Sequence, residues 1–209
     1  AGFVDIVQCT GVGHDQIAAH VRSCWGTTIM FSREPEPRGT AGALRYARDW
    51  VQDTVLVENG DTIVTVDYHA LVTWHRLWRS VLTVAAQERS GGNGQVLLTH
   101  QPVGFGFPLQ SGRIVRVINE DPRDNDVYGH PLLVNAGVYV LDPNVLQVIP
   151  DGEICSLDRD VLPTLIERDA PCWAYADGVE FYDIGTPERY AQAQTRFQET
   201  KLGVGRATD

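Results

Sequence analysis

Two aspartates stand near the ends of short apolar runs, where a carboxylate needs a partner. Asp61 ends "VLVENGD" (Val55–Asp61), and Asp183 lies within "EFYDIGTPERY" (Glu180–Tyr190). A desolvated carboxylate is costly unless it is paired, so each aspartate either turns the chain at the surface or holds a cation. At about 4 Å the two would repel by about 4 kcal/mol at an effective dielectric near 20, and a divalent ion would turn that cost into binding. Oxygen donors alone suit Mg²⁺. Spacing alone favours a cap or turn role for either aspartate.

A loop of small residues is the second candidate for chemistry. In "REPEPRGTAGALRYA" (Arg33–Ala47), prolines favour an extended approach, and four small residues then open a helix: Gly39, Thr40, Ala41 and Gly42. Small side chains let a ligand approach the backbone, and the free N–H groups of a helix start are donors. The loop therefore suits a nucleobase edge or a phosphate. An ordinary strand-to-helix turn is the alternative.

"GVGHDQ" (Gly11–Gln16) also follows an apolar run and opens a helical pattern. A dinucleotide fingerprint would need a third glycine where Gln16 stands, and an acidic residue about 20 positions further on at the end of a second strand. A turn with Asp15 at the helix start explains the segment without a ligand. An NAD-dependent oxidoreductase is kept as an alternative function.

The histidines and cysteines form no metal or nucleophile motif. The six histidines make no H-x-x-x-H or H-E-x-x-H array, and no two cysteines form a C-x-x-C pair. A chain of this size needs no disulfide staples, so the four cysteines are expected to be free thiols in a reducing compartment. They are Cys9, Cys24, Cys155 and Cys172.

The elements that must position these residues follow from hydrophobic periodicity. An opening of alternating strands and helices predicts a parallel or mixed sheet covered by helices. Expected strands are Phe3–Cys9, Thr28–Ser32, Thr54–Asn59, Val81–Gln87, Gln95–Thr99, Ile114–Asn119 and Leu133–Leu141. Expected helices are Asp15–Arg22, Ala41–Trp50, Asp67–Arg79 and Ser156–Arg168, with another after Thr186 and Pro187. The middle strands, separated by turn-rich pieces, are expected to form hairpins or to extend a mixed sheet. One α/β domain over residues 1–209 is the economical interpretation.

Composition narrows the function classes. The chain has 209 residues, 43% of them hydrophobic, a formal net charge of −10 and a pI near 5.0. This net negative charge argues against nucleic acid or an anionic membrane as the main partner, but it does not exclude a small anionic ligand. No run approaches the roughly 20 apolar residues of a membrane span, and no signal peptide is visible. We expect a cytoplasmic protein. A homo-oligomer is compatible with the sequence.

Five motifs occur in an informative order: "EPEPRGTAGAL", "NGD", "NAGVYVLDP", "SLDRDVLP" and "DIGTPERYAQAQ". With them the chain resembles the sugar-1-phosphate nucleotidyltransferases, and among these the guanylyltransferases that act on mannose 1-phosphate or D-glycero-D-manno-heptose 1-phosphate. The resemblance implies a Rossmann-like, mixed but mostly parallel sheet flanked by helices. It also implies a Mg²⁺-dependent reaction in which a sugar 1-phosphate attacks the α-phosphorus of a nucleoside triphosphate, with GTP favoured. Pyrophosphate leaves, and a nucleoside diphosphate sugar forms.

The resemblance also implies roles for individual residues. Asp61 and Asp183 would be the catalytic metal ligands, and Gly39, Thr40, Ala41 and Gly42 would bind the nucleotide. The sugar would contact Gly60, Gly94, Glu120, Asn135 and Gly137. For the glycine that belongs to a Tyr-Gly pair in such enzymes, Asn93-Gly94 is the best-placed match here and Phe105-Gly106 a poorer one.

The chain departs from the family pattern in two places. Asp121 stands where a lysine is expected to pair with the sugar phosphate, so Arg116 or Arg123 would have to replace it. The usual first strand, its Gly-Gly-x-Gly-Thr-Arg phosphate loop and a later Pro-Lys-Pro do not occur. We therefore expect little or no turnover from these 209 residues alone. A fragment of an active enzyme, a chain completed by another subunit, and a non-catalytic nucleotide-sugar-binding or regulatory relative all fit this pattern.

Overall fold

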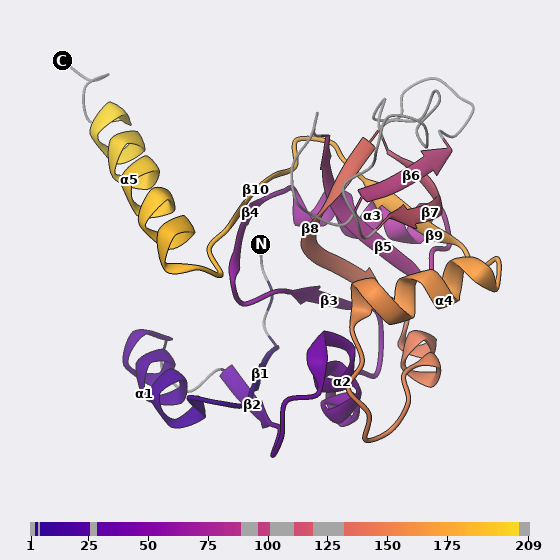
Figure 1. The fold of residues 1–209 in the computed structure, drawn as a ribbon, viewed down its shortest axis with the longest axis horizontal. Coiled ribbons are helices and arrows are strands. Elements are labelled where there is room, and N and C mark those ends of the chain that lie inside the picture. Colours follow the sequence, from indigo (N-terminus) through magenta and orange to yellow (C-terminus); the bar gives the residue numbers. More distant parts are fainter. Residues whose placement is uncertain are drawn as a thin grey trace.

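The computed structural model describes residues 3, 5–25, 29–88, 96–100, 111–118 and 132–204, and Figure 1 shows their arrangement. Ten strands are described: β1 (Ile6–Thr10), β2 (Ile29–Arg33), β3 (Val55–Glu58), β4 (Thr62–Thr65), β5 (Leu82–Glu88), β6 (Val96–His100), β7 (Gly112–Ile118), β8 (Leu132–Leu141), β9 (Cys172–Tyr175) and β10 (Glu180–Asp183). The α-helices are α1 (His14–Trp25), α2 (Gly39–Tyr46), α3 (Tyr68–Leu77), α4 (Leu162–Glu167) and α5 (Pro187–Val204). Short 3₁₀ helices at Arg48–Trp50 and Pro143–Val148 and a π-helical turn at Leu157–Val161 complete the described elements.

The central sheet has six strands in the order β3-β8-β5-β9-β7-β6. Its only parallel pair among the described strands is β5–β9; all its other pairs are antiparallel. The prediction of a mixed sheet is confirmed, and so is the expected hairpin-like pairing in the middle, but the prediction of a mostly parallel one is wrong. The reason is β8, which runs antiparallel to three neighbours, β3, β5 and β6.

Two smaller sheets flank this one. Strands β1 and β2 pair in parallel, as their intervening helix predicts, and β4 pairs antiparallel with β10. Within the described strands, β1 pairs only with β2, and β3 pairs only with β8. Each therefore has one edge without a partner among the described strands. The expectation that a usual first strand is missing stays a prediction.

The core has two apolar layers, one on each face of the six-stranded sheet. Successive strand residues point to opposite faces, so Val84 and Ala86 join one layer while Ala85 joins the other. The first layer packs against α2, the Pro143–Val148 helix and α4. The second packs against α3 through Leu71 and Trp74. The predicted helices thus cover both faces of the sheet.

Two helix starts follow the local chemistry of the sequence. Asp67 caps α3, because its carboxylate accepts the amides of His69 at 2.9 Å and Ala70 at 3.0 Å. The Thr186 hydroxyl accepts the Arg189 amide at 3.3 Å at the start of α5, and Pro187 is the first residue of that helix. Both helices begin within one residue of where the sequence predicts them. Across the described part of the chain, no helix combines the length and apolar character that crossing a bilayer requires.

Candidate functional site

The pairing of β4 with β10 brings Asp61 and Asp183 together. Asp183 lies opposite Thr62 in this ladder, and the Ile184 amide donates to the Asp61 carbonyl at 2.8 Å. A Cβ placed on Gly185 would lie 3.0 Å from Asp61 Oδ2 and 3.2 Å from Asp183 Oδ1. Because both oxygens lie within 3.2 Å of one point, they can be no more than about 6 Å apart. The two carboxylates therefore face a shared space beside Gly185.

The two carboxylates differ in how they are held. Asp183 Oδ1 accepts the Gly185 amide at 2.9 Å, and Asp183 Oδ2 forms an ion pair with Arg189 in the first turn of α5. Asp61 Oδ1 has a longer contact, 3.5 Å, with the Thr62 hydroxyl. Sequence reasoning singled out neither Gly185 nor Arg189. The signal for both was proximity in sequence to Asp183, which alone predicts no contact.

This donor set fits Mg²⁺ held partly by a substrate. The described residues contain no group of three or more histidine, cysteine or acidic side chains that could hold a metal ion by themselves. Mg²⁺ commonly keeps several waters and is bound through one or two carboxylates together with substrate phosphates. Asp61 and Asp183 supply two such carboxylates near a shared point. The pair suits a metal ion that a phosphate-bearing ligand also binds.

A bulge in β8 lies next to the turn that carries Asp61. In the pairing with β5, Ala85 lies opposite Val138 but Ala86 lies opposite Asn135, so β8 contains extra residues here. Gly137, at φ +74°, is within the bulge, and its carbonyl accepts the Asn59 amide at 2.9 Å. Bulges often occur next to active sites, where they redirect a side chain.

Side-chain contacts fix the shape of this bulge. Asn135 Oδ1 accepts the Gly137 amide at 2.9 Å, and Asn135 Nδ2 donates to the Tyr139 hydroxyl at 2.9 Å. Burial raises the pKa of Tyr139, which keeps that hydroxyl neutral. A Cβ on Gly137 would lie 2.9 Å from the Asn59 side-chain nitrogen, so this position has no room for a larger residue.

Three of the five residues predicted to contact the sugar lie in the part of the chain that the structure describes. Asn135 and Gly137 form the bulge, and Gly60 lies in the adjoining turn, where an added Cβ would meet no atom within 4 Å. Gly94 and Glu120 lie outside the described residues, as does Asp121, whose place a lysine was expected to take. Gly60, Asn135 and Gly137 thus gather around the Asn59–Asp61 turn.

The start of α2 differs from expectation. The amides of Ala41 and Gly42 donate to the Cys155 carbonyl at 2.9 and 3.1 Å, so they do not point outward as free donors. The Thr40 hydroxyl accepts the Leu157 amide at 2.9 Å. Gly39 has φ +73°, and a Cβ there would lie 2.5 Å from the same Cys155 carbonyl oxygen. The small residues therefore accommodate a returning segment of this chain. Their role in nucleotide binding stays a prediction.

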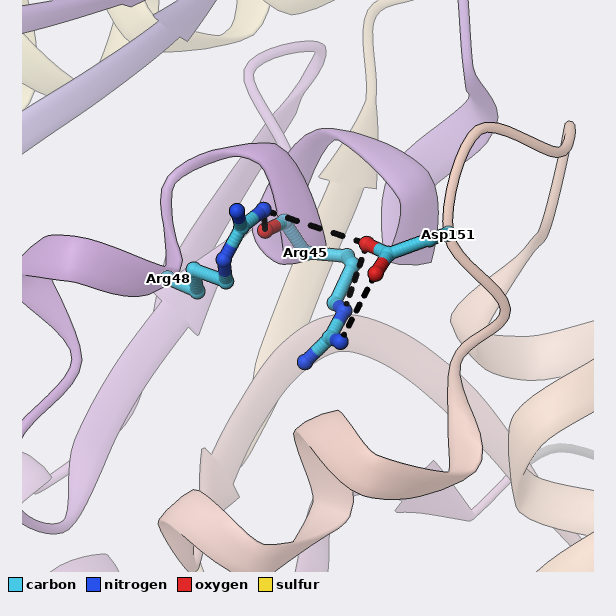
Figure 2. A network of polar contacts seen from close by, with 3 residues as sticks. All are labelled: Arg45, Arg48 and Asp151. Atoms are coloured by element: carbon cyan, nitrogen blue, oxygen red, sulfur yellow. Dashed lines mark hydrogen bonds and ion pairs between the residues drawn. The ribbon is translucent and has the colours of Figure 1, made fainter.

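An ion-pair network ties the same returning segment to α2, as Figure 2 shows. Arg45 donates to both carboxylate oxygens of Asp151 at 3.0 and 3.1 Å, and Arg48 lies 3.8 Å from that carboxylate. The hydrogen bonds from Arg45, with the positive charges around them, hold the pKa of Asp151 below its usual value. Together with the Cys155 contacts, this network fixes how the segment lies on the helix.

Glu34 is a candidate that sequence reasoning missed. Its Oε2 is buried without a hydrogen-bond partner among the described residues, and its Oε1 lies 3.5 Å from a Cβ position on Gly11. Burial raises the pKa of Glu34, although the Arg38 amide and guanidinium oppose that shift. A buried carboxylate oxygen without a donor calls for an explanation. The available signal was an acidic residue shortly before Gly39 in the proline-rich approach.

A model of the nucleotidyl transferase family matches residues 2–200. The chain belongs to this family. It is 31% identical over 176 residues to the mannose-1-phosphate guanylyltransferase of Mycobacterium tuberculosis, an alignment that covers 81% of this chain and 44% of the relative. It is 26% identical over 204 residues to the D-glycero-alpha-D-manno-heptose 1-phosphate guanylyltransferase of Aneurinibacillus thermoaerophilus, covering 94% and 80% of the two chains. The chain thus spans less than half the length of the first relative but most of the second.

Solved structures share the fold of this nucleotidyl transferase. HddC from Yersinia pseudotuberculosis, solved in complex with GMP-PN, superposes with a TM-score of 0.71 at 22% identity, covering 94% of this chain and 80% of that one. A UDP-glucose pyrophosphorylase complexed with UDP-glucose gives a TM-score of 0.69 at 15% identity, covering 94% and 81%. With these relatives the chain is assigned to the sugar-1-phosphate nucleotidyltransferases.

Proposed function

We propose that this nucleotidyl transferase transfers a nucleoside monophosphate from GTP to a sugar 1-phosphate. A sugar-phosphate oxygen attacks the α-phosphorus, the bond to the β-phosphate breaks, and pyrophosphate leaves as a nucleoside diphosphate sugar of the GDP-mannose or GDP-heptose type forms. The observation that carries the proposal is the approach of Asp61 and Asp183 to one point beside Gly185. A lone aspartate in a turn would not produce this arrangement.

In this proposal Asp61 and Asp183 are the catalytic pair that holds Mg²⁺. A bound Mg²⁺ ion would neutralise charge on the phosphates, which is a main source of catalysis in phosphoryl chemistry. The chain's own part is positioning. The β8 bulge and Gly60 adjoin the turn that carries Asp61, so Asn135 and Gly137 would place the sugar near the reacting phosphate. Gly94 and Glu120 would complete the sugar contacts by family resemblance.

Guanine is the proposed base because of Glu34. The guanine edge presents two neighbouring donors, N1–H and the N2 amino group, which one carboxylate can accept together. Uracil presents one N–H between two carbonyl acceptors, and a carboxylate would repel those acceptors. Glu34 Oε2, which has no hydrogen-bond partner among the described residues and lies five positions before Gly39 in the sequence, supports the first pairing. Since the Ala41 and Gly42 amides are occupied by Cys155, backbone contacts to the base would fall to Gly39 and Thr40.

Binding of Mn²⁺ and of GDP-mannose, measured by calorimetry, tests the metal pair directly. We expect Asp61→Asn and Asp183→Asn each to weaken Mn²⁺ binding at least about tenfold. Loss of a residue that only supports a metal ligand usually lowers metal affinity about tenfold or more, and loss of a ligand itself should cost at least as much. Asp177→Asn, an exposed carboxylate in the turn before β10, is the matched control and should bind as the wild type does. Equal Mn²⁺ affinity in all four proteins would refute the proposed site.

A pyrophosphate-release assay with GTP and several sugar 1-phosphates separates catalysis from binding. Because little or no turnover is expected from these 209 residues alone, binding of GDP-mannose without pyrophosphate release would fit a fragment of an active enzyme as well as a non-catalytic nucleotide-sugar-binding relative. Binding of NADH that is insensitive to Mn²⁺ would favour the oxidoreductase alternative.

A further inference from the structure

Among the described residues, both carboxylate oxygens of Asp183 have a partner, whereas only Oδ1 of Asp61 has one. The Gly185 amide donates to Asp183 Oδ1 at 2.9 Å, and Arg189 forms an ion pair with Asp183 Oδ2. Asp183 Oδ1 is the oxygen that lies 3.2 Å from the Cβ position of Gly185, the same point that Asp61 Oδ2 approaches at 3.0 Å. Arg189 therefore binds Oδ2, the oxygen farther from the shared space, and leaves Oδ1 directed toward that space.

Helix α5 fixes the position of Arg189. The Arg189 amide is bound by the Thr186 hydroxyl in the first turn of the helix. Further along the helix, Phe197 packs edge-to-face on Tyr182, with the two ring centres 5.7 Å apart. The Arg196 guanidinium lies 4.7 Å from the centre of the Tyr182 ring. Tyr182 and Asp183 are neighbours in β10, so the same strand that carries the carboxylate also anchors the helix. Figure 1 shows α5 leaving the end of β10 and standing apart from the central sheet.

The charge of Arg189 favours the metal-free arrangement of two carboxylates. Two like charges about 6 Å apart repel by about 3 kcal/mol at an effective dielectric near 20, and exposure to solvent reduces this further. A guanidinium on one of them offsets the repulsion and restricts rotation of the carboxylate. Hydrogen bonds of this kind orient metal ligands before the metal arrives, and their loss typically lowers metal affinity 10- to 100-fold.

We propose that Arg189 is a positioning residue for the metal pair, holding Asp183 so that its Oδ1 faces the space shared with Asp61. This inference rests on the proposed function, because it requires a divalent ion at these two aspartates. Arg189 touches neither the metal nor the substrate in this role. It acts only through the orientation of Asp183.

Mn²⁺ affinity of the nucleotide-free protein, measured by electron paramagnetic resonance, is the readout. We expect Arg189→Gln to weaken Mn²⁺ binding about 10- to 100-fold and Arg189→Lys to recover part of that loss. Arg76→Gln is the control, since it removes an exposed arginine from a different helix, α3. The control should bind Mn²⁺ within about twofold of the wild type, because salt screens an exposed charge that lies outside the site. Thermal unfolding would check that each variant is folded. If Arg189→Gln does not fold, the Mn²⁺ affinity of Arg189→Lys is compared with that of the wild type instead.

The outcomes separate this inference from the proposed function. If Asp61→Asn and Asp183→Asn lose Mn²⁺ while Arg189→Gln binds it as tightly as the wild type, only the positioning role is refuted. Tighter binding by Arg189→Gln would show that the arginine competes with the metal and would also refute it. If the wild type binds no Mn²⁺, or if the aspartate variants bind it normally, both proposals fail.

Discussion

Asp61 and Asp183 approach the same point from two strands that are far apart in the sequence and paired in space. Antiparallel pairing of β4 with β10 places the end of β10 beside the turn before β4. The point they share is next to Gly185, a residue without a side chain. The space between the carboxylates is therefore open because position 185 is glycine.

Replacing that glycine should block the metal with little cost to folding. In Gly185→Ala the methyl group would lie 3.0 Å from Asp61 Oδ2 and 3.2 Å from Asp183 Oδ1, in the space proposed for the ion. Both neighbours are ends of side chains that can shift slightly. We expect Mn²⁺ affinity to fall at least about tenfold, a loss of about 1.4 kcal/mol, with a nearly unchanged unfolding temperature. Calorimetry and thermal unfolding check the two parts, and unchanged Mn²⁺ affinity would contradict the placement of the ion.

Gly39→Ala should destabilise the fold. The added Cβ would lie 2.5 Å from the Cys155 carbonyl oxygen, which is backbone and cannot move freely, and φ is +73°. Left-handed backbone alone costs a non-glycine residue about 1–3 kcal/mol, so we expect a loss of at least about 2 kcal/mol of unfolding free energy with the clash included. Urea denaturation measures it. Gly60→Ala is the control, because its Cβ would meet nothing within 4 Å and its stability should be unchanged.

Glu34→Gln should shift base preference from guanine toward uracil. Glutamine offers one acceptor and one donor, so it cannot accept both guanine donors as the carboxylate can. A good two-contact pairing with a base is worth about 1–3 kcal/mol of discrimination, so the GTP-to-UTP affinity ratio should fall about tenfold to a hundredfold. Competition binding measures this ratio. Glu36→Gln, at the exposed acidic position two residues later, should leave it unchanged. A normal ratio in Glu34→Gln would remove the argument for guanine.

His75 should make stability fall on acidification. It is buried in α3, its Nδ1 lies 2.9 Å from the Thr83 hydroxyl oxygen, and burial lowers the pKa of His75 below its ordinary value of about 6.5. The unfolded chain then binds more protons below about pH 6.5, so this contribution is present above that pH and is lost as pH falls toward the folded pKa. In His75→Gln this part of the pH dependence should vanish, a change of at most about 1.4 kcal/mol per pH unit. Urea unfolding at several pH values between about 5 and 8 tests the prediction, and identical slopes would contradict it.

Local pattern was enough to predict most of the elements. Alternation predicted seven of the ten described strands to within a few residues, but β4, β9 and β10 were not among them. The starts of α3 and α5 could also be predicted, because an N-cap such as Asp67 or Thr186 depends only on neighbouring amides. The direction of β8 could not be predicted in the same way. Strand periodicity is identical for parallel and antiparallel partners, so the mostly antiparallel sheet appeared only in the structure.

The same distinction between local pattern and tertiary structure applies to the candidate site. The sequence by itself determined which side chains are available: two aspartates after apolar runs, an Asn-Ala-Gly segment and a glycine-rich helix start. Only the tertiary structure decided that Asp61 meets Asp183, that Arg189 holds the latter, and that Cys155 occupies amides expected to be free. These contacts join residues whose separation is set by strand pairing and chain return. Periodicity and capping report only on residues within a turn or two of one another, so they carry no information about such partners.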